Sequence, residues 1–504
     1  MAPSGYQVLS TQESSFVHFE HRATPMHVAA VSIFERAKLA GADGRLDVER
    51  ITAHIESTLD ELPHYRERLA WAPITRRPIW VDDEHFNVHY HVRHTALPAP
   101  GSDEQLEALV GRVLSQHLDR EKPLWETWIV DSLVGDRFAL IAKVHHCMVD
   151  GVGGMGVLAK QLSPSAEVGE VPKCLPFEAR SQPSGLQLVT DEIGRRLALP
   201  FRALGAVARI ARDPLGTLGA LADSGRSVAA ALSSALLPPA ETPFNERIGP
   251  HRRVALRTTE LARVKALKNR LDATVNDVVL ALVAGAIRSY LAGRSVPLAD
   301  LDYKVCVPVN RRAGADDLAA SNKVSALFVS LPVGEDDPLE RFRKIREQTL
   351  RLQETDAARG IELLTDLADL TGSVALTRFG VELATRLHPY NLIVSTVPGP
   401  QQPVYMLGAR LLALYPQLPL FARQGLGIAA LSYDGKICWG LIGDWELAPD
   451  LDQLGRDLDG ALAELESAAR LSRPQPRLAA RRASTNLSSE TTSAASTRPI
   501  GEAL

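Results

Sequence analysis

The sequence is poor in cysteine and in net charge, and each shortage argues against a class of protein. Its four cysteines, Cys147, Cys174, Cys306 and Cys438, are scattered over 504 residues and form no CxxC pair. Neither a disulfide framework nor a zinc knuckle is indicated, and a reducing cytoplasm fits best. The formal net charge is −4. No global basic field therefore points to nucleic acid as a partner.

Long hydrophobic runs are also missing. The first residues, MAPSGYQVLS, show no basic start followed by an apolar stretch, so no signal peptide is expected. No window holds about 18 uncharged apolar residues, so no segment is expected to span a membrane. Apolar residues still make up 45% of the chain and charged residues 23%, as in soluble globular proteins. The length indicates two domains and additional segments.

The chain divides by composition into four segments. Residues 1–185 and 246–471 each mix helices, strands and hairpins without strict strand–helix–strand alternation, which predicts an α+β fold with two layered domains. Residues 186–245 are rich in Ala, Leu and Arg and predict a helical linker. Its apolar faces would pack on the protein itself or lie on an anionic membrane. Residues 472–504 are rich in Arg, Ser, Thr and Ala and predict a disordered tail.

Periodicity and turn chemistry predict several elements. Ser102 with Gln105, and Thr274 with Asp277, resemble capping boxes that begin helices. The dipeptide Asp434–Gly435 predicts a tight hairpin. Alternating or β-rich runs predict strands at His27–Glu35, Thr127–Leu133, Arg137–His145, Tyr303–Val309, Val324–Val333, Asn391–Val397, Leu426–Tyr433 and Lys436–Ile442.

The most informative stretch is KVHHCMVDG, which ends at Gly151. His145 and His146 close a strand of buried character, and Asp150 follows four residues after the second histidine. Histidine titrates near neutrality, so it can accept a proton from an alcohol as a bond forms. On these residues alone three interpretations remain: a structural histidine pair, a metal site, and a general base. No second His/Asp cluster is spaced to complete a metal site.

The glycines after the histidines imitate a nucleotide-binding loop. Residues 151–156 satisfy GxGxxG between a predicted strand and a predicted helix. A dinucleotide fold would continue with a strand ending in an acidic residue, but the loop SPSAEVGEVPKCLP follows instead. Gly151 and Gly154 are therefore expected to turn the backbone beside the histidines and to leave room for a ligand.

HHCMVDG resembles the HHxxxDG motif of the bacterial wax ester synthase/acyl-CoA:diacylglycerol acyltransferase family, part of the HxxxD coenzyme A-dependent acyltransferase superfamily. The resemblance covers about residues 5–470. Two positions depart from the family pattern, with Ala29 in place of a glycine and Thr396 in place of an asparagine. The other similar segments are PMHV from Pro25, Pro123–Leu124–Trp125, Asn276–Asp277, PVNRR from Pro308, and STVPGP from Ser395.

The resemblance implies two chloramphenicol-acetyltransferase-like α+β domains with an active-site tunnel at their interface. It implies an O-acyltransferase that moves a long-chain acyl group from acyl-CoA to diacylglycerol or a long-chain alcohol. The product would be triacylglycerol or wax ester. No acyl-enzyme is needed, no GxSxG elbow is present, and no metal or redox cofactor is implied. The expected location is cytoplasmic, peripheral to a membrane or to lipid droplets.

The resemblance also implies roles for individual residues. His146 would be the general base, and His145 would shape the site. Asp150 would hold local structure through Arg312. Asn276, in the first turn of its helix, would donate to the oxyanion of the tetrahedral intermediate, although it would equally serve as a cap.

Two further groups complete the candidate site. Gly151, Gly154, Ser395, Thr396 and Gly399 are assigned to substrate binding, the last three in a turn near the domain junction. Pro123, Leu124 and Trp125 are expected to be structural and to pack the start of a strand.

Two alternatives to this function stay open. The first keeps the fold but takes the acyl group from a carrier protein. The second is a non-catalytic protein of a lipid-droplet or membrane surface, which the intact HHxxxDG motif disfavours.

Overall fold

The computed structural model describes most of both predicted domains. The described residues are 5–41, 43–148, 156–167, 174, 176–194, 239–310, 324–354, 378, 381–382, 385–386 and 388–471. Most of the predicted linker and the whole predicted tail lie outside the described residues.

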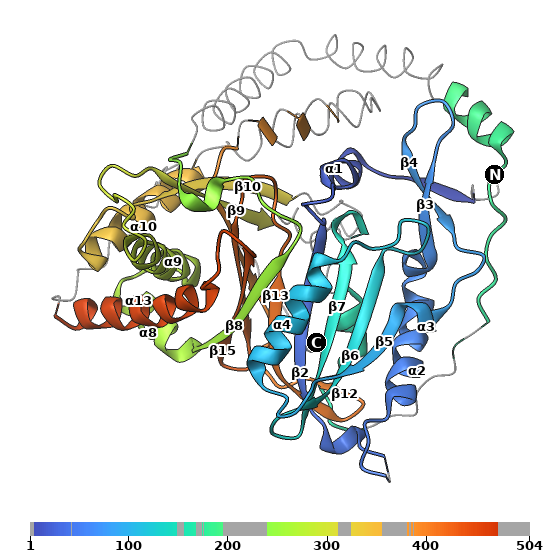
Figure 1. Cartoon of the computed structure of the whole chain (residues 1–504), viewed down its shortest axis with the longest axis horizontal. Helices are drawn as coiled ribbons and strands as arrows, with labels where there is room; N and C mark the ends of the chain where they lie inside the picture. Colours follow the sequence, from blue (N-terminus) through green and yellow to red (C-terminus); the bar gives the residue numbers. More distant parts are fainter. Residues whose placement is uncertain are drawn as a thin grey trace, which may run out of the picture.

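The N-terminal half is built on a mainly antiparallel six-stranded sheet of order β12-β13-β2-β7-β6-β5. Its helices lie against this sheet (Figure 1). Strand bounds are β2 His27–Glu35, β5 Val92–Ala96, β6 Trp125–Leu133 and β7 Arg137–His145; helix bounds are α1 Thr11–Phe19, α2 Val48–Thr58, α3 Val88–His91, α4 Asp103–Ser115 and α5 Gly156–Gln161. A small second sheet of order β1-β4-β3 is formed by Tyr6–Val8, Pro78–Asp82 and Glu67–Trp71.

Two strands of the N-terminal sheet come from the C-terminal part of the sequence. β12 (Tyr405–Met406) pairs with β13 (Ala409–Gln417), and β13 runs antiparallel to β2. These strands were not predicted from the sequence. No hairpin turn connects β13 to its partner β2, because β2 lies almost 400 residues earlier in the chain.

The C-terminal half has a six-stranded sheet of order β10-β9-β11-β14-β15-β8. Asp434 and Gly435 connect β14 and β15 with φ angles of 42° and 75°, which confirms the predicted hairpin. The strands are β8 Arg252–Glu260, β9 Tyr303–Asn310, β10 Val324–Leu331, β11 Leu392–Pro398, β14 Leu426–Tyr433 and β15 Lys436–Asp444; the helices are α8 Leu261–Arg270, α9 Val275–Ala292, α10 Pro338–Glu354 and α13 Leu451–Leu471.

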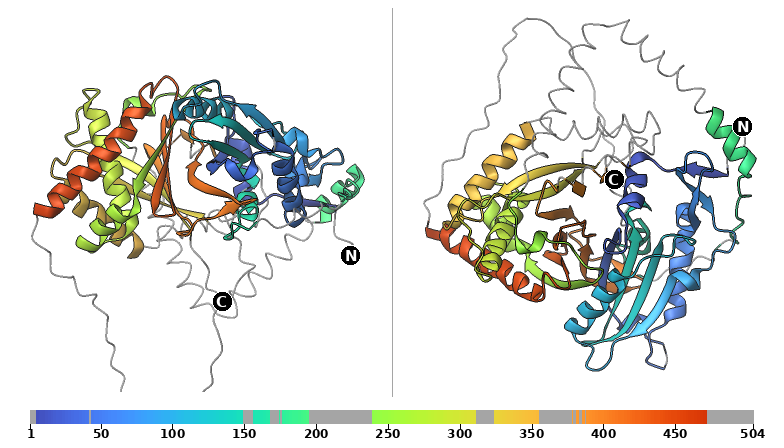
Figure 2. Two further views of the ribbon diagram at one scale, coloured as in Figure 1. Left: turned by 90° about the horizontal axis from the view of Figure 1, so that it is seen from below. Right: turned by 45° about the horizontal axis from the view of Figure 1, so that its top comes forward.

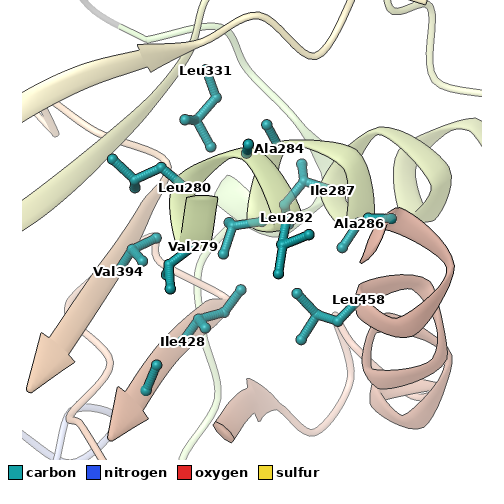
Figure 3. Packing of buried hydrophobic residues seen from close by; sticks show 14 of the residues in the cluster. Val279, Leu280, Leu282, Ala284, Ala286, Ile287, Leu331, Val394, Ile428 and Leu458 are labelled. Carbon is teal, nitrogen blue, oxygen red and sulfur yellow. The ribbon is translucent and has the colours of Figure 1, made fainter. Parts of the chain in front are cut away.

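Helix α9 is the centre of the C-terminal core. Figure 3 shows Leu282 and Ala286 facing Leu458 of α13, while Val279 lies toward Ile428 of the sheet. By length and composition α9 could cross a membrane, but 72% of that window is buried in the protein itself. A helix that is apolar all round and covered on all sides is typical of a protein core.

Capping boxes begin both α4 and α9, as the sequence predicts. Ser102 and Gln105 exchange hydrogen bonds at the start of α4, and Thr274 and Asp277 do so at the start of α9. Each box satisfies backbone N–H groups that the first helical turn leaves unpaired.

The two halves pack through α4 and β8. Glu107 of α4 accepts hydrogen bonds from the backbone of Leu256 and from Arg257. Gly111 lies so close to β8 that a Cβ atom would be 2.7 Å from the carbonyl oxygen of Arg252. In Figure 2 the helices α9, α10 and α13 cover the side of the C-terminal sheet that faces away from the N-terminal half. Of the candidate histidines, His145 ends β7 of the N-terminal sheet and His146 follows directly after it.

Candidate active site

His145 and His146 lie where three of the sequence motifs meet. His145 is the last residue of β7 and pairs in register with His27 at the start of β2. Its backbone N–H donates to the carbonyl oxygen of Leu124 at 2.9 Å, and that of His146 donates to Met26 at 2.8 Å. The segments PMHV, PLW and HHxxxDG, which are distant in sequence, therefore hold one strand end.

The Pro123–Leu124–Trp125 segment is buried and opens β6. Leu124 and Trp125 are 0% and 1% exposed, and the Trp125 indole donates to the carbonyl oxygen of Tyr65 at 2.7 Å. These contacts pack the beginning of the strand.

His146 is partly exposed and stacks on an aromatic ring from helix α1. The Phe16 and His146 ring centroids are 3.8 Å apart with an interplanar angle of 14°. Nδ1 of His146 is buried and has no hydrogen-bond partner among the described residues. Since Nδ1 faces inward, Nε2 is the nitrogen that a substrate would reach.

The environment of His146 favours the neutral ring. Burial lowers the pKa of His146 to about 4. A neutral imidazole at cellular pH is the form that accepts a proton.

His145 is buried, with a side chain only 1% exposed. Its Nδ1 accepts the backbone N–H of Cys147 at 3.1 Å and lies 2.9 Å from the Cys147 sulfur. Its Nε2 lies 3.6 Å from Oε1 of Glu20. Both ring nitrogens are thus turned toward protein groups, which separates His145 from the accessible ring of His146.

Glu20, which the sequence analysis did not single out, is the centre of a buried cluster. Its side chain is 4% exposed, and Oε1 lies 3.5 Å from His27 Nε2 and 3.4 Å from His117 Nδ1. Oε2 accepts hydrogen bonds from Arg120. We call Glu20, His27, His117, Arg120 and His145 the Glu20 cluster.

Charges within the Glu20 cluster are strongly perturbed. Burial raises the pKa of Glu20, but the adjacent rings of His117, His145 and His27 outweigh it and hold the pKa well below its usual range. Burial lowers the pKa of His27 to about 3 despite its contact with Glu20. The hydrogen bond to Glu20 raises the pKa of His117. The cluster therefore holds an ionised carboxylate beside a neutral His27.

Asn276 is the second residue of α9 and is partly exposed. The neighbouring Asp277 is fully engaged, because its carboxylate accepts hydrogen bonds from Thr274 and from the Thr349 hydroxyl. Asp277 completes the cap, and the side chain of Asn276 forms no hydrogen bond with any described residue.

Ser395 and Thr396 lie within β11 of the C-terminal sheet and only Gly399 follows it, so the prediction of a turn was wrong for the first two. Ser395 and Thr396 pair in parallel register with Ala429 and Ala430 of β14. The Thr396 hydroxyl is buried without a partner in the described part of the chain. Gly399 donates its N–H to Ser432 at 3.3 Å, and a Cβ there would meet the Ser432 carbonyl.

Other candidate residues cannot be placed. Asp150, Gly151, Gly154 and Arg312 lie outside the described residues. No hydrogen bond within the described ranges joins His146 to the candidates of the C-terminal half, so their convergence stays a prediction.

The predicted interface tunnel also stays a prediction. One cavity of about 530 Å³ lies elsewhere, and it is lined by Glu56, Arg66, Glu84, Phe86, Asn87, Val88, His89, Cys174, Pro176 and Phe177. No candidate site residue lines it. Among the described residues, no group of three or more His, Cys, Asp or Glu is arranged to hold a metal ion.

Two family models match the chain. The wax ester synthase/diacylglycerol acyltransferase catalytic domain matches residues 9–279, and the C-terminal domain of the same family matches residues 320–466. The chain belongs to the wax ester synthase/diacylglycerol acyltransferase family. It is an acyltransferase, and the family predicted from HHCMVDG and its companion motifs is confirmed.

Individual relatives agree with this family. A Mycobacterium tuberculosis protein named as a diacylglycerol O-acyltransferase is 32% identical over 469 residues, which cover 91% of this chain and 89% of the relative. A second one from that organism, tgs2, is 32% identical over 478 residues and covers 92% of this chain and 99% of the relative.

Solved structures confirm the predicted α+β fold. The wax ester synthase/diacylglycerol acyltransferase of Marinobacter aquaeolei VT8 matches with a TM-score of 0.66 and 26% identity, over 92% of this chain and 100% of that one. The first condensation domain of the calcium-dependent antibiotic synthetase matches with a TM-score of 0.56 and 16% identity, over 93% and 99%. The second likeness concerns the fold alone.

Proposed function

We propose that this acyltransferase moves a long-chain acyl group from acyl-CoA to the hydroxyl of diacylglycerol or of a long-chain alcohol, with His146 as general base. The observation that carries the proposal is the state of His146. Its ring is partly exposed, neutral at cellular pH and stacked on Phe16 at the end of β7. Relatives named as diacylglycerol O-acyltransferases support the choice of acceptor.

The reaction needs one proton acceptor that later becomes a donor. Nε2 of His146 takes the proton of the acceptor hydroxyl while its oxygen attacks the thioester carbonyl carbon. The tetrahedral intermediate then collapses, the carbon–sulfur bond breaks, and the coenzyme A thiolate takes the proton back from His146. A positioned base of this kind contributes roughly 10²–10⁴-fold to the rate.

Asn276 is the proposed donor to the oxyanion of the intermediate. Its position in the first turn of α9 places it among free backbone N–H groups, and its amide is not engaged by any described residue. Removal of one such donor typically costs about 10²–10³-fold in rate. For Asp150 the proposed role is structural, through an ion pair with Arg312.

The direct test is a donor and acceptor panel on purified wild type and His146→Ala. Acyl-CoA and acyl-carrier protein are offered separately as donors, with diacylglycerol, a long-chain alcohol or neither as acceptor. We expect ester from acyl-CoA with wild type and a large loss with His146→Ala. Ester formed only from the carrier-bound donor, or equal activity of the variant, would refute the proposal.

We also propose that the enzyme meets its substrates at a lipid surface while otherwise residing in the cytoplasm. Four large apolar side chains gather beside the β1-β4-β3 sheet. Trp71 and Ile74 of the β3–β4 hairpin are 40% and 45% exposed, and Leu186 and Ile193 of helix 185–194 are 75% and 46% exposed. Hydrogen bonds from Ile74 and Thr75 to Glu192 hold the hairpin against the helix.

Vesicle sedimentation tests this surface. Wild type should sediment with anionic phospholipid vesicles, and the double variant Trp71→Ser/Ile74→Ser should sediment less while keeping activity on detergent-dispersed substrate. Val134→Ser, at an exposed apolar position in a different hairpin, is the matched control. Unchanged sedimentation of the double variant would refute the proposal.

A further inference from the structure

The Glu20 cluster places three histidines around one carboxylate oxygen behind the candidate base. The ring nitrogens of His27, His117 and His145 lie 3.5, 3.4 and 3.6 Å from Oε1 of Glu20. The backbone N–H of Met26 also donates to Oε1 at 3.3 Å. Oε1 therefore lies within ion-pair distance of ring nitrogens from strands β2 and β7 and from the segment after α4, while the Nε2 atoms of His27 and His145 are buried without a hydrogen bond to any described residue.

Arg120 balances the charge of Glu20 by binding its other oxygen, Oε2. Oε2 accepts from Nε and Nη2 of Arg120 at 3.0 and 2.6 Å. Because the guanidinium neutralises the carboxylate, the neighbouring histidines need not be protonated to compensate a buried charge. His27, whose pKa is lowered to about 3 by burial, faces the carboxylate as a neutral ring.

A ring nitrogen that accepts a hydrogen bond carries no proton, so the contacts of His145 decide where its N–H lies. Nδ1 accepts the N–H of Cys147 at 3.1 Å and must be the unprotonated nitrogen. The proton then lies on Nε2, which faces Oε1 of Glu20. The Cys147 backbone thus selects this tautomer, and the carboxylate of Glu20 lies on the side of the ring where its N–H points.

This arrangement is coupled directly to His146. The contact between Cys147 N–H and His145 Nδ1 spans the turn that contains His146. Glu20 is also the C-terminal cap residue of α1, the helix that carries Phe16 onto the His146 ring. Glu20 therefore links the end of α1, through its backbone cap, to the ring of His145, through its side chain.

We propose that Glu20 is a positioning residue for the reaction: it fixes His145 as the Nε2–H tautomer and so holds His146 beneath Phe16 in its reactive orientation. The inference rests on the proposed role of His146. Misplacement of a reacting group by about 1 Å can cost on the order of 10²-fold in rate. The effect should fall on kcat, because Glu20 does not reach the substrate.

The test compares full-length Glu20→Gln with Glu126→Gln. Glu126 is another buried carboxylate of the same half, whose side chain is 8% exposed and which pairs with Lys143 and Arg93. Glu20→Gln should lower kcat about 10²-fold with KM changed less than about threefold. Glu126→Gln should lower stability without a comparable loss of kcat per folded molecule.

A tautomer measurement separates positioning from general damage. In protein labelled with ¹⁵N-histidine, the His145 signals, assigned by their loss in His145→Gln, should report Nε2–H in wild type. In Glu20→Gln they should shift toward a mixture of tautomers. An unchanged His145 tautomer, or a kcat within threefold of wild type, would overturn the inference.

Two further outcomes keep the hypotheses apart. Stoichiometric metal in purified wild type, lost in Glu20→Gln, would overturn the inference in favour of a metal site. Full activity of His146→Ala would refute the proposed function, whereas the His145 tautomer would still report on Glu20 independently.

Discussion

The core around α9 and the end of β7 are both buried, but the first is filled by apolar side chains and the second by polar ones. Around α9 the interior consists of apolar side chains such as Leu282, Ala286 and Leu458. At the end of β7, Glu20 and His145 are equally buried but polar. An apolar interior is stable through the sum of many weak contacts, whereas a polar interior requires each donor and acceptor to find a partner. The first region provides stability, and the second provides a defined geometry.

The largest contrast between the regions should come from removing the base. His146→Ala should lower kcat/KM by about 10³-fold. The free energy of unfolding should change little, because the ring is partly exposed and makes no side-chain hydrogen bond with the described residues. Steady-state kinetics and thermal unfolding check the two halves of this prediction. His85→Ala, which changes an exposed histidine, is the control. A loss of kcat/KM below tenfold in His146→Ala would contradict the prediction.

Leu282→Ala should have the opposite profile. Leu282 is 1% exposed in the α9 core, and truncation of such a side chain costs about 2–5 kcal/mol of unfolding free energy. Activity per folded molecule should stay at the wild-type level. Leu350→Ala on α10, where the side chain is 49% exposed, should cost under about 0.5 kcal/mol. Equal destabilisation by both variants would argue against a well-packed α9 core.

Lowering the pH should reduce the free energy of unfolding through the buried histidines of the polar region. The pKa values of His27 and His146 are lowered from 6.5 to about 3 and about 4 in the folded protein. Between these values and 6.5 the unfolded chain binds more protons, so stability rises with pH and is lost as pH falls below 6.5. The loss is roughly 1 kcal/mol per histidine and pH unit.

Unfolding followed from pH 7.5 to 5 measures this loss. His27→Gln should flatten the pH dependence of stability, since the contribution of that ring is removed. A stability that stays constant, or that increases toward pH 5, would show that these histidines are not neutral in the folded protein.

Substitution of two glycines by alanine should give the smallest effects on stability, with opposite signs. Gly111→Ala places a Cβ 2.7 Å from the Arg252 carbonyl where the two halves meet, and should cost about 1–3 kcal/mol. Gly460→Ala in α13 meets nothing within 4 Å and should stabilise by up to about 1 kcal/mol. Chemical denaturation of both variants checks the opposite signs. Destabilisation by Gly460→Ala would contradict its open surroundings.

Much of the fold could be predicted from local patterns. The strand His27–Glu35 and the hairpin 434–435 follow from alternation and turn chemistry, and the structure confirms both. The boxes at Ser102 and Thr274 were predictable because a cap involves residues only three positions apart. The histidine pair was predictable because its motif is contiguous.

The sequence by itself therefore determined the α+β class, many of its strands and helices, the family and the identity of the candidate base. Only the tertiary structure decided that β13 completes the N-terminal sheet and that Glu20 collects His27, His117 and His145 around its carboxylate. The neutral state of His146 was also decided there, since its main cause is burial. The physical reason is range: helix caps and turns depend on neighbours in the chain, whereas strand pairing and burial depend on packing between distant segments.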